Sequence, residues 1–412
     1  MPRIRPSTLI KASRDNPLLP LLLKECRTLE SARNELRWLR EHALRTSQTR
    51  TRQQPNPTTP LAEWKMHLLS MCRQRSRGYP LQYILGDQPF GDLEILCRPG
   101  VLIPRPDTES YVIQAAKLVE QMAMAEATPS ERSSTDKDDP KPLRILDLCT
   151  GTGCITLLLH ALLSPRFEHL RVMGIDISSK ALSLARKNLD HNLQQGLLTH
   201  RASTDVQFHR ADVLGLPTGG GGDDDADGIP NVEKILSEYF DQPGEMEMSE
   251  DLLAIDLEPG CDLLISNPPY ISTSDFRNGT TARSVRLFEP KLALVPPPPR
   301  SQQFPTPTPT PTPTSAMGAV RPEDIFYRRI LELSYKLRTK VTVLECGDIK
   351  QAERVIEMHN FMAPGQDRFQ DHFDVQVWPN TEQDMAFYGF HHNDGSRCVI
   401  IQRGIRSSDS SR

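Results

Sequence analysis

The chain has 412 residues, a formal net charge of −4 and 37% hydrophobic residues. This length predicts two domains or one large decorated domain, the near-neutral charge excludes a global basic field for nucleic acid, and the lack of any run of about 18 apolar residues argues against a membrane span. None of the eight cysteines forms a Cys-x-x-Cys pair, so we expect no metal site, no disulfide framework and a reducing compartment.

The first 14 residues carry Arg3, Arg5, Lys11 and Arg14 without any acidic residue, and Ser and Thr lie between them. This composition resembles a mitochondrial presequence, so residues 1–15 are predicted to be one. A short basic tail on a cytoplasmic protein fits the same pattern, and the two interpretations stay open.

Residues 16–78 show helical spacing of apolar side chains. One helix is predicted from Pro20 to Ala43, a polar break follows over 46–60, and a second amphipathic helix begins at Leu61. We expect a small helical domain with little core of its own. Residues 79–110 contain glycine and proline breakers and predict a linker and hairpin region, in which Asp107 or Thr108 could cap the next helix.

Residues 111–405 alternate between predicted strands and helices. The strands are expected at 144–148, 171–176, 206–209, 262–266, 341–345, 373–378 and 397–401, and the main helices at 154–163, 179–192, 325–337 and 351–358. Such alternation predicts a mostly parallel sheet covered by helices on both faces, with ligands at the carboxyl ends of the strands. Three segments of biased composition are predicted to be disordered insertions, at about 128–142, 218–258 and 295–314.

A glycine-containing loop follows the first of these strands. The strand residue Asp147 is followed by Leu148 and then by the loop itself, Cys149-Thr150-Gly151-Thr152-Gly153. A dinucleotide site would require a third glycine where Thr156 stands, and Asp147 would repel a pyrophosphate. A cationic sulfonium ligand with a free amino group suits this carboxylate better. S-Adenosylmethionine is therefore the expected ligand, with an ordinary strand–turn–helix as the plain alternative.

Acidic residues also follow the next two strands. Asp176 ends the second strand, where a carboxylate can accept both ribose hydroxyls. Asp212 and Val213 follow the third strand, and an acid there can lie beside an adenine amino group. Either acid alone could equally be a capping residue, but their placement after consecutive strands favours a nucleoside site.

The fourth strand leads into Asn267-Pro268-Pro269-Tyr270. The two prolines lack N–H donors and restrict the backbone, so carbonyl oxygens and the Asn267 side-chain oxygen remain to accept hydrogen bonds. Two fixed acceptors can hold both hydrogens of a planar –NH2 group, and Tyr270 offers an aromatic face. The tetrad therefore predicts in-line methyl transfer to a planar nitrogen, in which positioning and electrostatics do most of the work.

The surrounding motifs resemble the HemK/PrmC family. The resemblance is carried by Leu81–Gly86, Phe90-Gly91, Val101–Glu109, Asp147–Gly153, Asn267–Tyr270, Val285–Pro290, Leu292–Leu294 and Tyr327–Ile330, and it covers most of residues 17–402. It implies a Rossmann-like seven-stranded class I methyltransferase sheet with a small N-terminal helical domain that binds substrate. The implied reaction transfers a methyl group from S-adenosylmethionine to the glutamine N5 in the Gly-Gly-Gln motif of a peptide chain release factor.

Residue roles follow from the same resemblance. Residues 149–153 would surround the methionine part of the donor, Asp176 its ribose and Asp212-Val213 its adenine, while Asn267–Tyr270 would hold the glutamine amide. Arg105 and Glu289 would shape the substrate channel, although a surface ion pair would look the same in sequence. Cys149 departs from the family, which commonly has glycine there, and Cys346 stands where a branched apolar residue is usual. We expect a monomer without direct nucleic-acid or membrane contact.

Three other functions use some of the same features. An N6-adenine or other nucleic-acid amino methyltransferase would use the same tetrad, with Tyr270 stacked on the base, but would be expected to carry a basic groove or a large target-recognition domain. An NAD-dependent oxidoreductase is disfavoured by the missing glycine and by the tetrad. A catalytically inactive methyltransferase-like interaction protein is disfavoured because the tetrad is intact.

Overall fold

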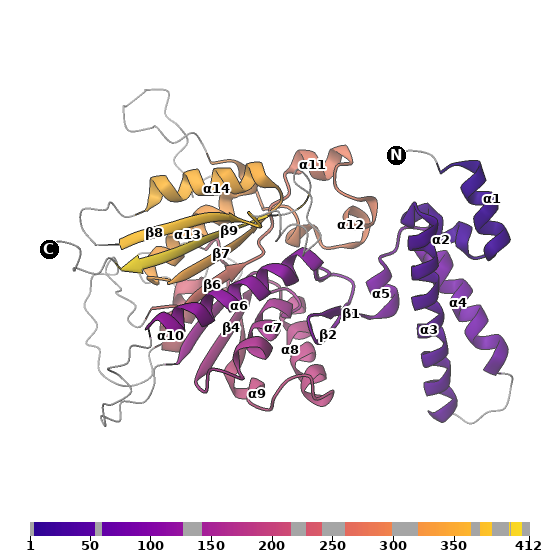
Figure 1. Ribbon diagram of the computed structural model, residues 1–412, viewed down its shortest axis with the longest axis horizontal. Helices are drawn as coiled ribbons and strands as arrows, with labels where there is room; N and C mark the ends of the chain where they lie inside the picture. Colours follow the sequence, from indigo (N-terminus) through magenta and orange to yellow (C-terminus); the bar gives the residue numbers. More distant parts are fainter. Residues whose placement is uncertain are drawn as a thin grey trace.

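The computed structural model describes residues 4–53, 60–126, 142–215, 228–240, 260–298, 320–363, 371–380, 395 and 397–405. Within these ranges the chain forms an N-terminal helical domain, a two-stranded hairpin and a seven-stranded sheet with helices around it (Figure 1). The helical domain stands to one side of the sheet, and the hairpin lies between the two (Figure 1).

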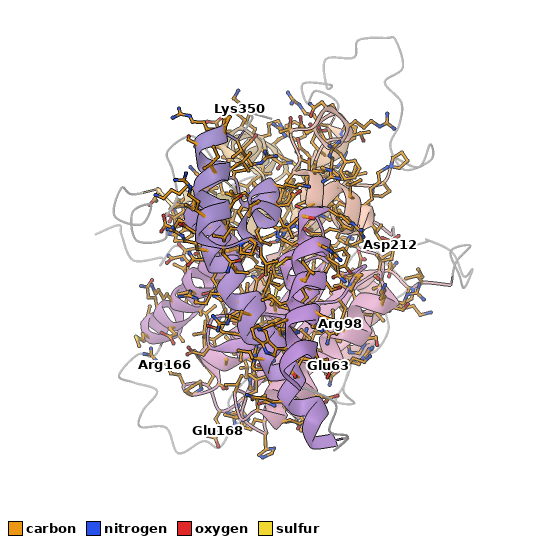
Figure 2. All side chains as sticks on the ribbon, turned by 90° about the vertical axis from the view of Figure 1, so that its right-hand side faces the viewer. Glu63, Arg98, Arg166, Glu168, Asp212 and Lys350 are labelled. Carbon is orange, nitrogen blue, oxygen red and sulfur yellow. The ribbon has the colours of Figure 1, made fainter. Side chains whose placement is uncertain are left out.

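The helical domain contains α1 (Pro6–Asp15), α2 (Leu19–Cys26), α3 (Leu29–Gln53) and α4 (Pro60–Ser76). The prediction of one continuous helix from Pro20 to Ala43 is wrong, because Arg27 adopts a left-handed conformation with φ of 64° and ends α2. The polar break predicted over 46–60 is also displaced, since α3 continues to Gln53 through residues of fair helix propensity. The long helices α3 and α4 run side by side (Figure 2).

Helix α1 packs into the core of this domain. Its Ala12 is fully buried, and Asp15 forms an ion pair with Arg33 of α3. Residues 1–3 lie outside the described residues, but the rest of the predicted presequence is the first helix of the folded domain in this structure. The presequence pattern and a packed helix therefore coincide in one segment.

The hairpin consists of β1 (Asp87–Phe90) and β2 (Leu93–Leu96), and the short helix α5 (Leu81–Leu85) precedes it. Asparagines of α8 (Ser179–Gln194) hold its second strand: Asn192 accepts from the Glu94 N–H at 3.0 Å, and Asn188 accepts from the Leu96 N–H at 2.7 Å. Helix α6 (Pro106–Glu126) then begins earlier than expected, with its proline in the first turn, where a missing N–H costs nothing.

All seven predicted strands are present, and the predicted fold class is confirmed. The sheet order is β5-β4-β3-β6-β7-β9-β8, and only β9 runs antiparallel to its neighbours. The central strands are almost wholly apolar because both faces of the sheet are covered. The strand bounds are β3 (Leu143–Leu148), β4 (Leu170–Asp176), β5 (Val206–Arg210), β6 (Leu263–Ser266), β7 (Val341–Cys346), β8 (Asp371–Trp378) and β9 (Arg397–Ile405).

Alternating side chains of the strands feed two separate apolar clusters. Ile145 of β3 lies in the cluster beneath α6, α7 (Cys154–Leu163) and α8, whereas the next residue, Leu146, lies in the cluster beneath the helices of the opposite face. Those helices are α10 (Val232–Phe240), α13 (Ile325–Lys336) and α14 (Ile349–Met362) (Figure 1). The short elements are α9 (Ala202–Asp205), α11 (Thr273–Asn278), α12 (Arg283–Phe288) and the 3-10 turns Lys291–Ala293 and Pro322–Asp324.

Two of the segments predicted to be disordered insertions are partly folded. Within 218–258, helix α10 buries Val232 and Leu236, and its Glu233 forms an ion pair of 2.5 Å with Arg329. An apolar pair at helical spacing was hidden there by Gly- and Asp-rich neighbours. Within 295–314, Val295 is buried, and its N–H donates a 2.9 Å hydrogen bond to the Lys291 carbonyl of the 3-10 turn. The third segment, 128–142, lies outside the described residues except for its last residue.

Candidate active site

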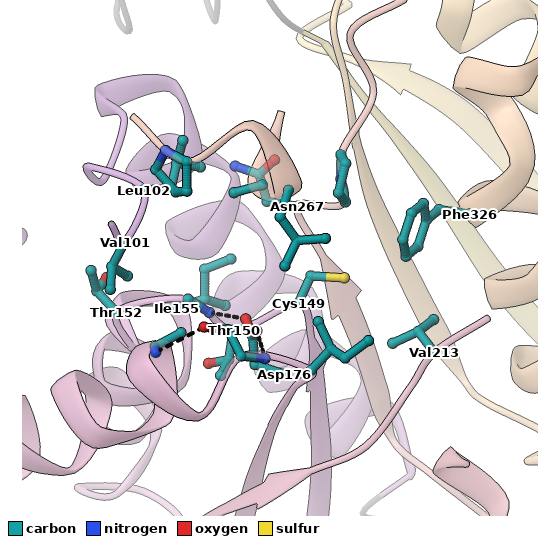
Figure 3. Close-up of a pocket in the computed structure, with 18 of the residues that line it drawn as sticks. Val101, Leu102, Cys149, Thr150, Thr152, Ile155, Asp176, Val213, Asn267 and Phe326 are labelled. Atoms are coloured by element: carbon teal, nitrogen blue, oxygen red, sulfur yellow. Dashed lines mark hydrogen bonds between the residues drawn. The ribbon is translucent and has the colours of Figure 1, made fainter. Parts of the chain in front are cut away.

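A cavity of about 260 Å³ opens at the carboxyl ends of the parallel strands, where the sheet order changes direction (Figure 3). In Figure 3, Val101 and Thr152 lie on one side of it and Val213 and Phe326 on the other. The predicted site residues on its wall are Cys149, Thr150, Gly151, Thr152, Asp176, Asp212, Val213, Asn267, Pro269 and Arg105. The structure thus brings the loop after β3, the ends of β4 and β5 and the tetrad to one cavity.

The loop after β3 turns through left-handed conformations. Gly151 and Gly153 have φ of 58° and 78°, and a Cβ on Gly153 would lie 2.9 Å from the Phe208 ring and 3.0 Å from the Ala185 side chain. Cys149 also has a positive φ of 63°, which non-glycine residues adopt at some cost in energy. This backbone explains why glycine suits the position at which this chain has cysteine.

Asp147 lies beneath the loop and not on the cavity wall, which differs from the expected contact with the ligand. It is fully buried, and its Oδ2 accepts hydrogen bonds from the hydroxyls of Thr150 at 2.6 Å and Thr156 at 2.7 Å. Burial raises the pKa of its carboxyl to about 7, and its Oδ1 has no hydrogen-bond partner among the described residues. Asp147 therefore anchors the loop, and Thr156 has a role that a third glycine could not fill.

Asp176 both faces the cavity and holds the loop. Its Oδ2 accepts from the Gly151 N–H at 2.9 Å, and its Oδ1 accepts from the Ser178 N–H at 2.8 Å. Burial raises the pKa of this carboxyl, while those N–H donors oppose the shift. Each oxygen keeps a lone pair, so the carboxylate can still accept the two hydroxyls of a ribose.

The rest of the wall is mainly apolar and fits the remaining parts of an adenosyl ligand. Ile155, Leu214 and Phe326 line the cavity beside Val213, and Asp212 lies among them. The Arg329 guanidinium supports this region from behind by donating to the Val213 carbonyl at 3.1 Å. An apolar slot with one carboxylate at its edge suits adenine, whose amino group donates hydrogen bonds. The residues present therefore fit S-adenosylmethionine.

The members of the tetrad point in different directions. Asn267 and Pro269 line the cavity, whereas Pro268 and Tyr270 do not. The Tyr270 ring packs on Gly347, where a Cβ would lie 3.1 Å from it, and its hydroxyl donates to Glu345 at 3.4 Å. The expectation that Tyr270 presents its ring to the substrate is thus not met in this structure, because the ring packs on the chain after β7.

Arg105 and Glu289 form an ion pair of 2.7 Å across 184 positions of sequence. Only 2% of the Glu289 side chain is exposed, against 31% for Arg105, and Glu289 also accepts from the Ile103 N–H at 3.1 Å. This pair is therefore half-buried and ties the segment before α6 to the end of α12. Of the two residues, Arg105 lies on the cavity wall and Glu289 lies behind it.

Other residues of the site were not predicted. The sequence predicts Thr108 as a possible helix cap, but its hydroxyl connects Asn267 to Glu345, a residue that no sequence motif marks. The signal for Thr108 was its place in the segment Val101–Glu109. Pro297 and Pro298, from a segment predicted to be disordered, also line the cavity. Among the described residues there is no cluster of potential metal ligands and no helix that is long and apolar enough to cross a membrane.

The cavity, its carboxylate at the end of β4 and the tetrad after β6 lie on one edge of a class I sheet. The α/β domain is accordingly that of an S-adenosylmethionine-dependent methyltransferase. Family models agree: a PrmC N-terminal domain matches residues 21–86, and a methyltransferase domain matches residues 139–236.

Sequence relatives define the family more closely. The mitochondrial MRF1 N(5)-glutamine methyltransferase MTQ1 of Saccharomyces cerevisiae is 33% identical over 72% of this chain and 68% of its own length. The probable Schizosaccharomyces pombe counterpart is 37% identical over 55% of each chain, and the release factor glutamine methyltransferase of Chlorobaculum tepidum is 33% identical over 55% of this chain and 56% of its own. The chain belongs to the family of release factor glutamine methyltransferases, whose members are protein-glutamine N5 methyltransferases.

Proposed function

We propose that this protein transfers a methyl group from S-adenosylmethionine to the side-chain amide nitrogen of the glutamine in the Gly-Gly-Gln motif of a peptide chain release factor. The observation that carries the proposal is the position of Asn267, on the wall of the same cavity as Asp176 and the loop after β3 (Figure 3). A side-chain amide that can accept hydrogen bonds from the substrate thus lies beside a pocket suited to the methyl donor. The names of the sequence relatives supply the release factor as substrate.

The protein's part in this reaction is binding and orientation. S-Adenosylmethionine supplies the electrophilic methyl group when it is bound. The Asn267 side-chain oxygen and the backbone carbonyls of the tetrad accept the two amide hydrogens, because the prolines leave those carbonyls outside any strand ladder. Since an amide lone pair is delocalised, acceptors that favour partial pyramidalisation of the nitrogen make it a better nucleophile. The proton leaves after transfer, so no strong base is required.

Mitochondria are the proposed location. The two yeast relatives are named as mitochondrial enzymes, and the first 14 residues have the composition of a presequence. The proposed partner is then a mitochondrial release factor, and we propose that the methyltransferase acts on it as a monomer.

One assay distinguishes the release factor from other acceptors. The protein and labelled donor are incubated with a release factor, with the same factor whose Gly-Gly-Gln glutamine is changed to alanine, and with DNA. We expect label only on the unchanged factor; label that persists on the alanine factor, or label on DNA, contradicts the proposal. Asn267→Ala should abolish transfer while donor binding persists.

A further inference from the structure

A chain of hydrogen bonds runs from the tetrad into the protein interior. The Asn267 Nδ2 group donates to the Thr108 hydroxyl at 3.1 Å, and the same hydroxyl donates to Glu345 Oε2 at 2.6 Å. Thr108 and Glu345 are each 3% exposed. Thr108 stands in the first turn of α6, Glu345 near the end of β7 and Asn267 directly after β6, so three separate elements meet here.

The number of available hydrogens decides which group donates and which accepts along these hydrogen bonds. A threonine hydroxyl has one hydrogen, and an ionised carboxylate can only accept. The Thr108 hydrogen therefore belongs to the short bond with Glu345, and its oxygen is left to accept a hydrogen from Asn267. Only the –NH2 end of the Asn267 amide can supply one. The carbonyl end of that amide is then the part that remains for the cavity.

The same carboxylate reaches the other end of the tetrad. The Tyr270 hydroxyl donates to Glu345 Oε1 at 3.4 Å, while Oε2 serves Thr108. The backbone at Glu345 is itself held, because the Tyr327 hydroxyl donates to its carbonyl at 2.8 Å. One buried side chain thus contacts both Asn267, through Thr108, and Tyr270 directly. A rigid anchor of this kind preorganises the residues that it holds.

We infer that Thr108 and Glu345 are positioning residues for methyl transfer, which orient the Asn267 amide so that its oxygen, and not its –NH2 group, meets the substrate nitrogen. This inference rests on the proposed function, since it requires an acceptor substrate with N–H groups to hold. With the amide reversed, two –NH2 groups would face each other, and the substrate would lose an acceptor.

A purely structural role would require much less. A buried carboxylate costs free energy because it loses its hydration, and apolar residues of similar size often stabilise a core better. Glu345 nevertheless lies buried at the carboxyl edge of the sheet, with both of its oxygens directed to groups that hold the tetrad. Its neighbour Cys346, by contrast, points into the apolar cluster on the opposite side of the strand.

Three variants separate orientation from folding. Thr108→Val keeps the shape of the side chain but removes the hydroxyl, and Thr108→Ser is its matched control because it keeps the hydroxyl. Glu345→Gln keeps the shape and reverses the direction: the new amide can donate to Thr108, whose hydrogen then goes to Asn267 and draws its oxygen away from the cavity. The measured quantities are kcat, KM for the release factor, and the Kd of S-adenosylhomocysteine by calorimetry, which also reports folding.

We expect kcat of Thr108→Val and Glu345→Gln to fall by about 100-fold, the loss typical of a misplaced reacting group. Thr108→Ser should stay within about threefold of the wild type, and all three Kd values should change little. Retention of kcat within threefold in both Thr108→Val and Glu345→Gln overturns the inference. The inference is also overturned if Thr108→Val loses nucleoside binding and Thr108→Ser loses activity. The serine variant keeps the hydroxyl, so the hydroxyl would then not decide activity. A wild-type protein without activity on the release factor contradicts the proposed function instead.

Discussion

The Thr156 hydroxyl donates a 2.7 Å hydrogen bond to the fully buried Asp147 carboxylate, which supports the cofactor loop from below. Thr150 of the loop donates to the same oxygen at 2.6 Å. At the place where a dinucleotide site would have its third glycine, the loop is therefore held by side-chain hydrogen bonds.

Thr156→Val should weaken donor binding more than it weakens catalysis. The change removes one of two donors to a buried oxygen, at a cost of about 1–3 kcal/mol, part of which appears as loosening of the loop. We expect the Kd of S-adenosylhomocysteine to rise about tenfold, while kcat at saturating donor stays near the wild-type value. Isothermal calorimetry and initial rates measure the two quantities. Thr156→Ser is the control, and an unchanged Kd in the valine variant would show that the bond does not hold the loop.

Much of the fold was visible in the sequence because the information is local. Each central strand is a short apolar run that ends at or just before a polar or glycine residue, as β4 ends at Asp176. The site residues at strand ends, such as Asp176 and Asn267, follow from the same rule, since the carboxyl ends of parallel strands share one edge. These positions could be inferred without any knowledge of tertiary contacts.

The rest depends on contacts between distant parts of the chain. The bond from Thr108 to Glu345 joins residues 237 positions apart, and no spacing rule pairs them. The direction of the Tyr270 ring is set by Gly347, which leaves room for it. Helix α10 owes its place to the pair of Glu233 and Arg329, 96 positions apart. For Thr108 and Tyr270 the sequence predicts the local backbone, whereas the composition of 218–258 predicts disorder at α10. In each case the partner lies in a distant part of the chain.

The Arg105–Glu289 pair should govern substrate binding more than donor binding. Glu289→Gln removes the charge that holds Arg105 at the cavity wall, although its side-chain oxygen can still accept from Ile103. We expect KM for the release factor to rise about 3- to 30-fold, with the Kd of S-adenosylhomocysteine unchanged, because a half-buried charge pair is lost. Arg105→Lys should show a smaller rise in KM, since lysine keeps the charge. Equal changes in KM and in the nucleoside Kd would mean that the pair shapes the whole cavity.

The N-terminal domain is far more basic than the rest of the chain: residues 1–78 contain 16 Lys and Arg but only 6 Asp and Glu. Arg37 and Arg40 are exposed on α3 beside Trp38 and Trp64. Added salt should raise KM for the release factor, since screening weakens attraction between exposed charges, and should leave kcat unchanged. Arg37→Gln/Arg40→Gln should reduce this salt dependence. The control is Arg166→Gln, an exposed arginine of the α/β domain (Figure 2).

Measurements of KM between about 0.05 and 0.3 M salt cover Debye lengths from roughly 14 to 6 Å, and so test this attraction directly. A KM that is independent of salt would mean that the basic surface around Arg37 and Arg40 does not contact the substrate. A salt dependence that appears with added RNA and not with the release factor would assign this surface to nucleic-acid binding.

The activity should rise as pH increases through about 7. Burial raises the pKa of Glu345 to about 7, and its ionised form is the one that can only accept from Thr108. Protonation allows Glu345 to donate and Asn267 to reverse, so kcat should fall on the acidic side. The groups that face Glu345 are Thr108, Tyr270, Asp107 and Arg105, with Cys398 opposite it on β9. A pH profile of kcat measures this fall on the acidic side. The fall should be absent from the residual activity of Glu345→Gln.

Stability of the ligand-free protein should change with pH in the opposite direction. Asp147 and Glu345 both have folded-state pKa values of about 7, above their ordinary values of 3.8 and 4.5. Between those limits the folded state binds more protons than the unfolded state, so the free energy of unfolding decreases as pH rises. Both side chains should lose this contribution progressively from about pH 4.5 to 7. In Asp147→Asn/Glu345→Gln the decrease in Tm between about pH 5 and 7.5 should be smaller than in the wild type. An equal decrease in both proteins would mean that other groups, and not these two carboxyls, set the pH dependence.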